Sequence, residues 1–272
     1  MVDPENGFFE LVNNTQTVAG TAKKDLSVSI SNSNKLITVS GEINADAPEK
    51  AVFKALEDPA LWAGVNLRAF LQQRGITVEG KVVTGKTPAD AEILATNESK
   101  NLSFIMTDMN KFSNNFVAEM LTKNLAATET KEGASLKRGV ELIRDELKKM
   151  GLSENDVVLK NPSGLTRYNQ ISAASLSKVL TEIKNDFSIY PAFVDSLPIA
   201  GIDGTLKKRF KNTPGEGWVR AKTGYIDGVA SLAGYAGKRD GTVLTFSFLY
   251  NGPRDEAIVR EAFDHILLSS LK

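Results

Sequence analysis

Apolar residues recur along the chain either at every second position, which predicts strands, or at every third or fourth position, which predicts helices. Leu26, Val28 and Ile30 alternate with polar residues, which predicts a strand, and the polar stretch 31–34 then supplies a turn. Further strands are predicted over 36–43, 76–83, 218–225, 229–237 and 242–250. Apolar residues three and four apart predict helices over 58–75, 99–109, 114–125, 134–150, 172–183 and 255–271.

The order of these elements predicts an α/β (α+β) chain in two parts. Residues 1–85 hold strands and one helix, so we expect a small β-rich part there. Residues 86–272 hold a cluster of helices, then three antiparallel strands and a last helix. The polar, proline-interrupted stretch 84–100 is the expected boundary. A hydrophobic fraction of 42% is enough for a buried core.

Composition excludes several classes of function. Lys+Arg and Asp+Glu both number 33, so no net charge favours nucleic acid or an anionic membrane. The chain has no cysteine, which rules out disulfides and cysteine nucleophiles. Its one histidine, His265, is predicted on a helix surface, so we expect no Ser-His-Asp triad, no metal and no cofactor. No apolar run reaches membrane-spanning length, so no transmembrane segment is expected.

A short polar motif precedes one of the predicted helices. Ser113 and Asn115 lie two residues apart, immediately before an apolar helical pattern. On a turn that enters a helix, two such side chains can converge on one cleft. The alternative is that they only cap the helix, a position that suits both residue types.

A second motif lies on the first of the three late strands. Lys222 supplies positive charge, Thr223 a hydroxyl, and Gly224 room for a ligand to approach the backbone. At a sheet edge this combination suits an extended ligand that ends in a carboxylate and pairs with the strand. The alternative is an ordinary strand end followed by a turn.

In this order, Ser-x-Asn and then Lys-Thr-Gly on a strand resemble the penicillin-binding proteins and serine β-lactamases. The chain is similar to one subgroup, the D-alanyl-D-alanine carboxypeptidase/endopeptidase family of low-molecular-mass penicillin-binding proteins, whose catalytic domain carries a large insertion. The similar segments are 161–167, 197–206, 220–224 and 231–235. The resemblance implies that 8–83 are the last part of that insertion and 95–272 the C-terminal part of the catalytic domain.

The resemblance implies a mechanism in which a serine attacks the bond between two terminal D-alanines and water hydrolyses the acyl-enzyme. A lysine, rather than a histidine, activates that serine. On the matching positions, Ser113 would pass a proton toward the leaving amine, Asn115 would hold a substrate amide, and Lys222 would contribute positive potential.

The resemblance also implies how the substrate is bound. Thr223 would bind the terminal carboxylate, Gly224 would allow close approach, and the N–H of Tyr225 would form part of the oxyanion hole. Tyr225 stands where the family often has a small hydroxyl residue, which alters the fit at that corner. The implied partners are peptidoglycan stem peptides and β-lactams, in a periplasmic or other extracytoplasmic location.

One part of the family pattern is missing. The nucleophile motif Ser-x-x-Lys should precede Ser113, and nothing upstream matches; the two matches, 175–178 and 269–272, lie downstream. Residues 1–6 are not typical of a signal peptide, and we interpret the chain as a piece that lacks the nucleophile segment. This interpretation predicts an unfilled apolar groove beside the strand of Lys222, over which chains could self-associate.

Two alternatives remain open on the sequence. Residues 80–87 match the P-loop pattern G-x-x-x-x-G-K-[ST], in which Lys86 and Thr87 would contact phosphates and magnesium. The chain could also be a module that binds cell-wall peptides or a partner without cleaving anything.

Overall fold

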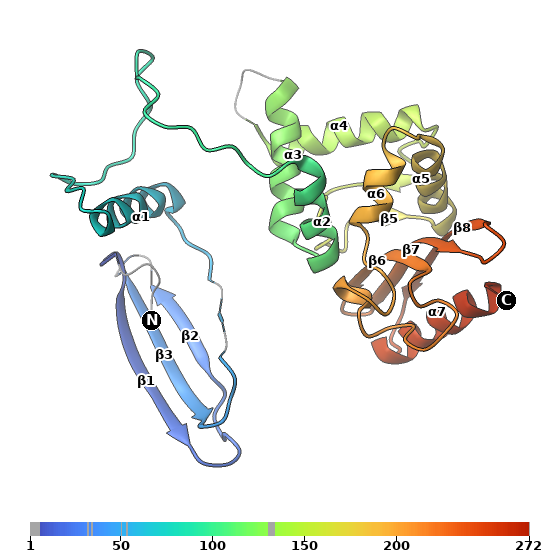
Figure 1. Ribbon diagram of the computed structural model, residues 1–272, viewed down its shortest axis with the longest axis horizontal. Helices are drawn as coiled ribbons and strands as arrows, with labels where there is room; N and C mark the ends of the chain where they lie inside the picture. Colours follow the sequence, from blue (N-terminus) through green and yellow to red (C-terminus); the bar gives the residue numbers. More distant parts are fainter. Residues whose placement is uncertain are drawn as a thin grey trace. The chain divides into compact units, whose positions relative to one another are not determined.

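The computed structural model describes residues 6–31, 33, 35–49, 51, 52, 54–129 and 134–271. The chain divides into two compact units, Met1–Thr96 and Asn97–Lys272. The division falls inside the polar stretch 84–100, a little after the boundary expected at residue 85. Figure 1 colours both units along the sequence.

The first unit is a three-stranded sheet with one helix. Strands β1 (Glu10–Val18), β2 (Ser27–Ser31) and β3 (Leu36–Asn44) lie in the order β1-β3-β2, with β1 parallel and β2 antiparallel to β3. Helix α1 (Pro59–Gln73) starts as predicted, because the Asp58 carboxylate accepts a hydrogen bond from the Leu61 N–H at 2.9 Å. Phe9, Val65 and Ala69 form the buried core of this unit.

The strand predicted over 76–83 is wrong, since this segment has no regular secondary structure. It follows Gly75 and contains Gly80, and both glycines have a left-handed backbone that a strand does not continue through. Val82 packs so closely over α1 that a Cβ on Gly64 would lie 2.5 Å from its Cγ1. Val82 is thus half-buried against the helix, whereas the other residues of 76–83 are exposed.

The second unit begins with helices. They are α2 (Leu102–Phe112), α3 (Asn115–Glu129), α4 (Leu136–Lys149), α5 (Ala173–Asn185) and the short, unpredicted α6 (Tyr190–Ser196). The cap of α2 is Asn101, whose side chain accepts from the Phe104 N–H, so this helix begins later than the predicted residue 99. Helices α3 and α4 touch at Gly139, where a Cβ would lie 2.1 Å from the Thr122 carbonyl oxygen.

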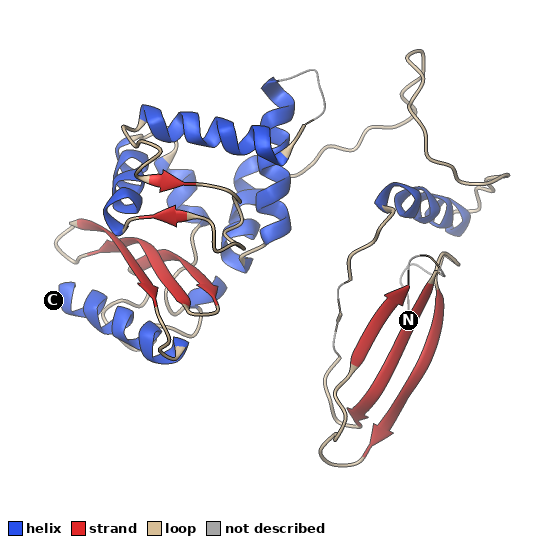
Figure 2. Cartoon of the chain, turned by 180° about the vertical axis from the view of Figure 1, so that it is seen from behind, coloured by secondary structure: helices blue, strands red, loops and turns tan. Residues whose placement is uncertain are grey.

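An antiparallel sheet follows, made of β6 (Val219–Ile226), β7 (Val229–Gly237) and β8 (Val243–Asn251) in that order. Helix α7 (Glu256–Ser270) covers one face and helices α5 and α6 lie on the other (Figure 2). Val219, Ala221 and Leu232 are fully buried on the α7 face. On the opposite face the Tyr235 hydroxyl donates to the Leu180 carbonyl at 2.7 Å. The short elements β4 (Val157–Val158), β5 (Gln170–Ile171) and η1 (Gly204–Leu206) were not predicted.

The apolar spacing predicts Ile258, Ala262, Ile266 and Leu267 on the inner side of α7, but of these only Leu267 is buried. Val259, Phe263 and Leu267 are buried, whereas Ile258 and Ile266 are 56% and 52% exposed. Two apolar stripes run along this helix, and the one with the phenylalanine fills the sheet face better. His265 is exposed, as predicted. Among the described residues, no helix combines the length and apolar character needed to cross a bilayer.

Candidate active site

Strand β6 is the edge of its sheet and is only partly covered. Its first residues meet the segment before η1: the Ala221 N–H donates to the Pro198 carbonyl at 3.1 Å, and the Val219 carbonyl accepts from Ala200 at 2.9 Å. Backbone groups of alternate strand residues point to the same side. The N–H groups of Thr223 and Tyr225 therefore face the same edge, beyond the covered part.

Ser113 ends α2 in an unusual conformation. Its φ is 54°, in the left-handed region that a residue with a Cβ seldom adopts. Such a conformation costs about 1–2 kcal/mol, and it exposes the side chain on the turn between α2 and α3. The residue that caps α3 is Asn114, whose side chain accepts from the Val117 N–H at 3.2 Å. Ser113 is the C-cap of α2, and N-capping of α3 therefore explains neither the Ser113 nor the Asn115 side chain.

The two sequence motifs meet in space. The Lys222 ammonium group donates to the Ser113 hydroxyl at 2.8 Å, across 109 residues of sequence. The same ammonium group donates to the Thr223 carbonyl, also at 2.8 Å. A positive charge is thereby fixed beside an exposed hydroxyl at the free edge of the sheet.

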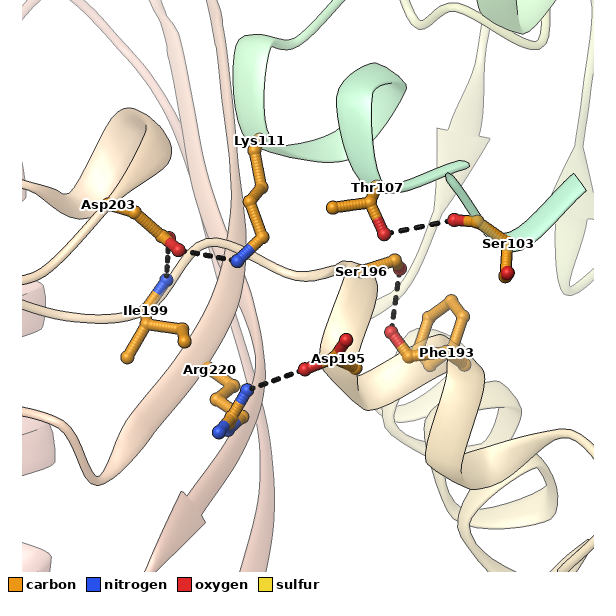
Figure 3. A network of polar contacts seen from close by, with 9 residues as sticks. All are labelled: Ser103, Thr107, Lys111, Phe193, Asp195, Ser196, Ile199, Asp203 and Arg220. Carbon is orange, nitrogen blue, oxygen red and sulfur yellow. Dashed lines mark hydrogen bonds and ion pairs between the residues drawn. The ribbon is translucent and has the colours of Figure 1, made fainter. Parts of the chain in front are cut away.

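The loop before and within η1 holds the two motifs together. The Lys111 ammonium group, in the last turn of α2, pairs with the Asp203 carboxylate at 2.5 Å, and Asp203 also accepts from the Ile199 N–H at 2.8 Å (Figure 3). From the same loop, Thr205 accepts a hydrogen bond from the Thr223 hydroxyl at 2.9 Å. These contacts fix the turn at Ser113 against β6.

The other predicted site residues, Asn115, Gly224 and Tyr225, make no side-chain hydrogen bond to Ser113, Lys222 or Thr223 within the described residues. Asn115 is exposed at the start of α3, and its side chain makes no hydrogen bond within the described residues. Gly224 is exposed, and a Cβ there would lie 2.4 Å from the Ser231 hydroxyl. The Tyr225 side chain is 52% exposed and its ring centre lies 5.7 Å from the guanidinium carbon of Arg260. The structure therefore brings Ser113, Lys222 and Thr223 into contact.

Burial lowers the pKa of the Lys222 ammonium group below its ordinary value of 10.5. Lys149 is the natural comparison, because its hydrogen bond to Glu146 raises its pKa. We expect Lys222 to lose its proton at lower pH than Lys149 in an NMR titration of ¹³C-dimethylated lysines. In the interval between the lowered pKa and 10.5, the unfolded chain binds more protons than the folded one. The free energy of unfolding should therefore rise with pH across that interval. Titration of Lys222 at or above the pH of Lys149 would contradict this expectation.

A cavity of about 760 Å³ also borders β6. Phe104 of α2, Val194 of α6 and the Arg220 side chain contribute to its wall. One guanidinium nitrogen of Arg220 is buried without a hydrogen-bond partner and lies 3.7 Å from the Asp195 carboxylate. Helix α2 has no buried residue at all. These features fit the expected groove beside the strand of Lys222; its covering by a neighbouring chain stays a prediction.

The downstream Ser-x-x-Lys matches are occupied by structural contacts. Ser175 is buried and shares a hydrogen bond with the Ser172 hydroxyl at 2.8 Å, while the Lys178 ammonium group donates to the Gly151 carbonyl at 2.8 Å. Ser269 donates to the Ile266 carbonyl at 2.7 Å. Lys272, the last member of the second match, lies outside the described residues.

The P-loop match has the wrong context. A phosphate-binding loop of this kind needs a strand before it and a helix after it. Residues 80–87 have neither, since 76–100 contain no strand or helix. The described residues also hold no group of three His, Cys, Asp or Glu side chains that could bind a metal.

Comparison with known proteins shows the family of the chain. Residues 1–269 match the family described as D-Ala-D-Ala carboxypeptidase 3 (S13). The chain belongs to this family. A D-alanyl-D-alanine carboxypeptidase of Actinomadura sp. (strain R39) is 34% identical over 254 residues, which are 90% of this chain and 47% of that protein. The D-alanyl-D-alanine carboxypeptidase DacB of Haemophilus influenzae is 31% identical over 201 residues, 73% of this chain and 42% of that protein.

A solved structure shares the fold. Penicillin binding protein 4 (dacB) from Haemophilus influenzae, complexed with a β-lactam, matches with a TM-score of 0.79 at 25% identity. The match covers 99% of this chain and 64% of that chain. The family and the α/β fold class predicted from the sequence are thus confirmed. The chain spans about half the length of the curated relatives it matches.

Proposed function

We propose that this chain is the C-terminal part of a serine-type D-Ala-D-Ala carboxypeptidase or endopeptidase that acts on peptidoglycan peptides through an acyl-enzyme. The observation that carries the proposal is the 2.8 Å hydrogen bond from Lys222 to Ser113 at the free edge of β6. It joins the Ser-x-Asn and Lys-Thr-Gly motifs on one surface. Substrates of this kind lie in the bacterial cell wall, so the parent protein acts outside the cytoplasm.

In this proposal the nucleophile comes from a Ser-x-x-Lys segment that the chain lacks. The lysine of that segment takes the proton of the serine hydroxyl, the oxygen bonds to the carbonyl carbon of the penultimate D-alanine, and the bond from this carbon to the nitrogen of the last D-alanine breaks. Water then hydrolyses the acyl ester and restores the serine. Ser113 passes a proton to the departing amine, because its hydroxyl can both accept and donate. The Lys222 charge biases Ser113 toward accepting and stabilises negative charge on the reacting atoms. Asn115, exposed and unpaired within the described residues, holds a substrate amide.

The free edge of β6 binds the substrate backbone. The Thr223 hydroxyl exchanges its Thr205 partner for the terminal carboxylate. Gly224 lets the ligand approach the strand, and the outward N–H of Tyr225 donates to the developing oxyanion. An extended peptide then continues the sheet beyond the covered start of the strand.

The chain by itself should form no covalent adduct with a labelled penicillin, since its own Ser-x-x-Lys serines are engaged in structural hydrogen bonds. Intact-protein mass spectrometry after incubation with benzylpenicillin measures this directly. An adduct mapped to Ser175 or Ser269 would refute the missing-nucleophile proposal.

The free β6 edge also favours a second candidate function, peptide binding without cleavage. Reversible binding of an N-acetylated peptide ending in D-Ala-D-Ala, with no adduct and no product, would support it for this chain.

A further inference from the structure

The first unit contains a cavity whose charged lining is entirely cationic. It has a volume of about 250 Å³. Lys35, Arg68 and Lys81 line it, and no acidic side chain among the described residues does. The three cations come from the turn before β3, the middle of α1 and the segment after α1, so only the folded unit assembles them.

Within the part of the chain that the structure describes, these cations are not neutralised by acidic side chains. None of the three makes an ion pair with another described residue. The Lys35 ammonium group lies 4.7 Å from the centre of the Phe8 ring, which holds it at the cavity wall. Three like charges around one cavity raise its positive potential and favour a bound anion.

The walls of this cavity are fixed by specific contacts. The Asn6 side-chain amide donates to Asn66 of α1 at 2.6 Å, and Phe8 packs edge-on against Trp62 at 5.4 Å. On the other side, Val82 lies against Gly64, where a Cβ would be only 2.5 Å away. The cavity is therefore preformed, which lowers the cost of binding a ligand.

We propose that this cavity binds the phosphate group of a phosphate ester. A carboxylate carries one negative charge, whereas a phosphate monoester carries about −1.5 to −2 at neutral pH and matches three cations better. The planar guanidinium of Arg68 suits two phosphate oxygens at once. Leu61, Val65 and Val82 form an apolar wall for the organic group that bears the phosphate. This site is independent of the D-Ala-D-Ala activity proposed above.

The test is an NMR titration of the full chain, labelled at Leu and Val methyl groups, with sn-glycerol 3-phosphate. Saturable shifts of the Leu61, Val65 and Val82 methyls are expected. Arg68→Gln and Lys81→Gln should each weaken binding about tenfold or more, because each removes a charge-assisted hydrogen bond. Lys86→Gln is the matched control: Lys86 is an exposed cation of the same segment but is not part of the cavity wall, so affinity should stay unchanged. Unchanged thermal unfolding of the variants separates lost binding from lost folding.

Comparison ligands decide the chemistry. Tighter binding of glycerol 3-phosphate than of inorganic phosphate or acetate supports the proposal. If acetate binds as tightly as glycerol 3-phosphate, the site does not prefer phosphate and the proposal is wrong. If inorganic phosphate binds as tightly, the site does not recognise the organic group of an ester. The absence of shifts at the three methyls, or an equal loss in Lys86→Gln, overturns the site itself.

Discussion

Replacing Gly234 with alanine is expected to separate the strand of Lys222 from its sheet. Gly234 lies in β7 opposite Ala221 of β6. A Cβ at this position would lie 2.2 Å from the Arg220 carbonyl oxygen and 2.6 Å from the Ala221 Cα. Both are backbone atoms, so no side-chain rotation can relieve the overlap, and β6 itself must move. The cost should be about 3 kcal/mol or more, at the upper end for overpacking.

This prediction is measured by thermal unfolding together with hydrogen exchange of the β6 and β7 amides. For a unit of this size, the loss corresponds to a fall of roughly 10 °C in the unfolding midpoint. Gly85→Ala is the control, because a Cβ there would meet nothing within 4 Å and its backbone is not left-handed. Its midpoint should stay within about 2 °C. A Gly234→Ala variant as stable as Gly85→Ala would show that the β6–β7 contact is looser than the structure has it.

The sequence predicted the longer helices and strands of the second unit because their apolar residues recur with a regular period. Strand β7, with Ala230, Leu232 and Ala236 on one face, is an example. Where a helix has two apolar sides, the pattern does not show which side is buried. Helix α7 carries Ile258 and Ile266 on one side and Phe263 on the other, and the side with Phe263 packs on the sheet. At 76–83 the pattern indicated a strand, but the segment pairs with none of the described strands.

The site was predictable only in part, for a different physical reason. Ser113 and Lys222 are 109 residues apart, so no local spacing relates them. Only the order of their motifs, which resembles a family pattern, indicated that they belong to one site. The contacts of Lys111, Asp203 and Thr205 could not be predicted from periodicity. An ion pair between a helix end and a distant loop has no regular spacing in the sequence. The left-handed conformation of Ser113 was equally invisible, because serine carries no preference for it.

Replacing Lys222 with alanine is expected to slow acylation by benzylpenicillin about 10²- to 10³-fold, in a polypeptide that joins this chain to its Ser-x-x-Lys segment. The ammonium group is the hydrogen-bond donor to Ser113, and its partial burial away from water lowers its pKa. In such a partly desolvated place a charge acts more strongly on the reacting atoms than it would in solvent. Removing it also leaves Ser113 free to rotate, so the proton path to the leaving amine is lost together with the charge.

Stopped-flow measurement of the acylation rate constant tests this prediction, and Lys178→Ala is its matched control. Lys178 also donates one hydrogen bond to a backbone carbonyl, that of Gly151, but lies on α5 and not on the free edge of β6. We expect its rate constant to equal that of the parent polypeptide. Thr223→Val should leave acylation by penicillin less affected than Lys222→Ala, because it removes a carboxylate contact and no charge. If Lys178→Ala slowed acylation as much as Lys222→Ala, both substitutions would act by lowering the stability of the fold. The pairing of Ser113 with Lys222 would then have no part in the chemistry.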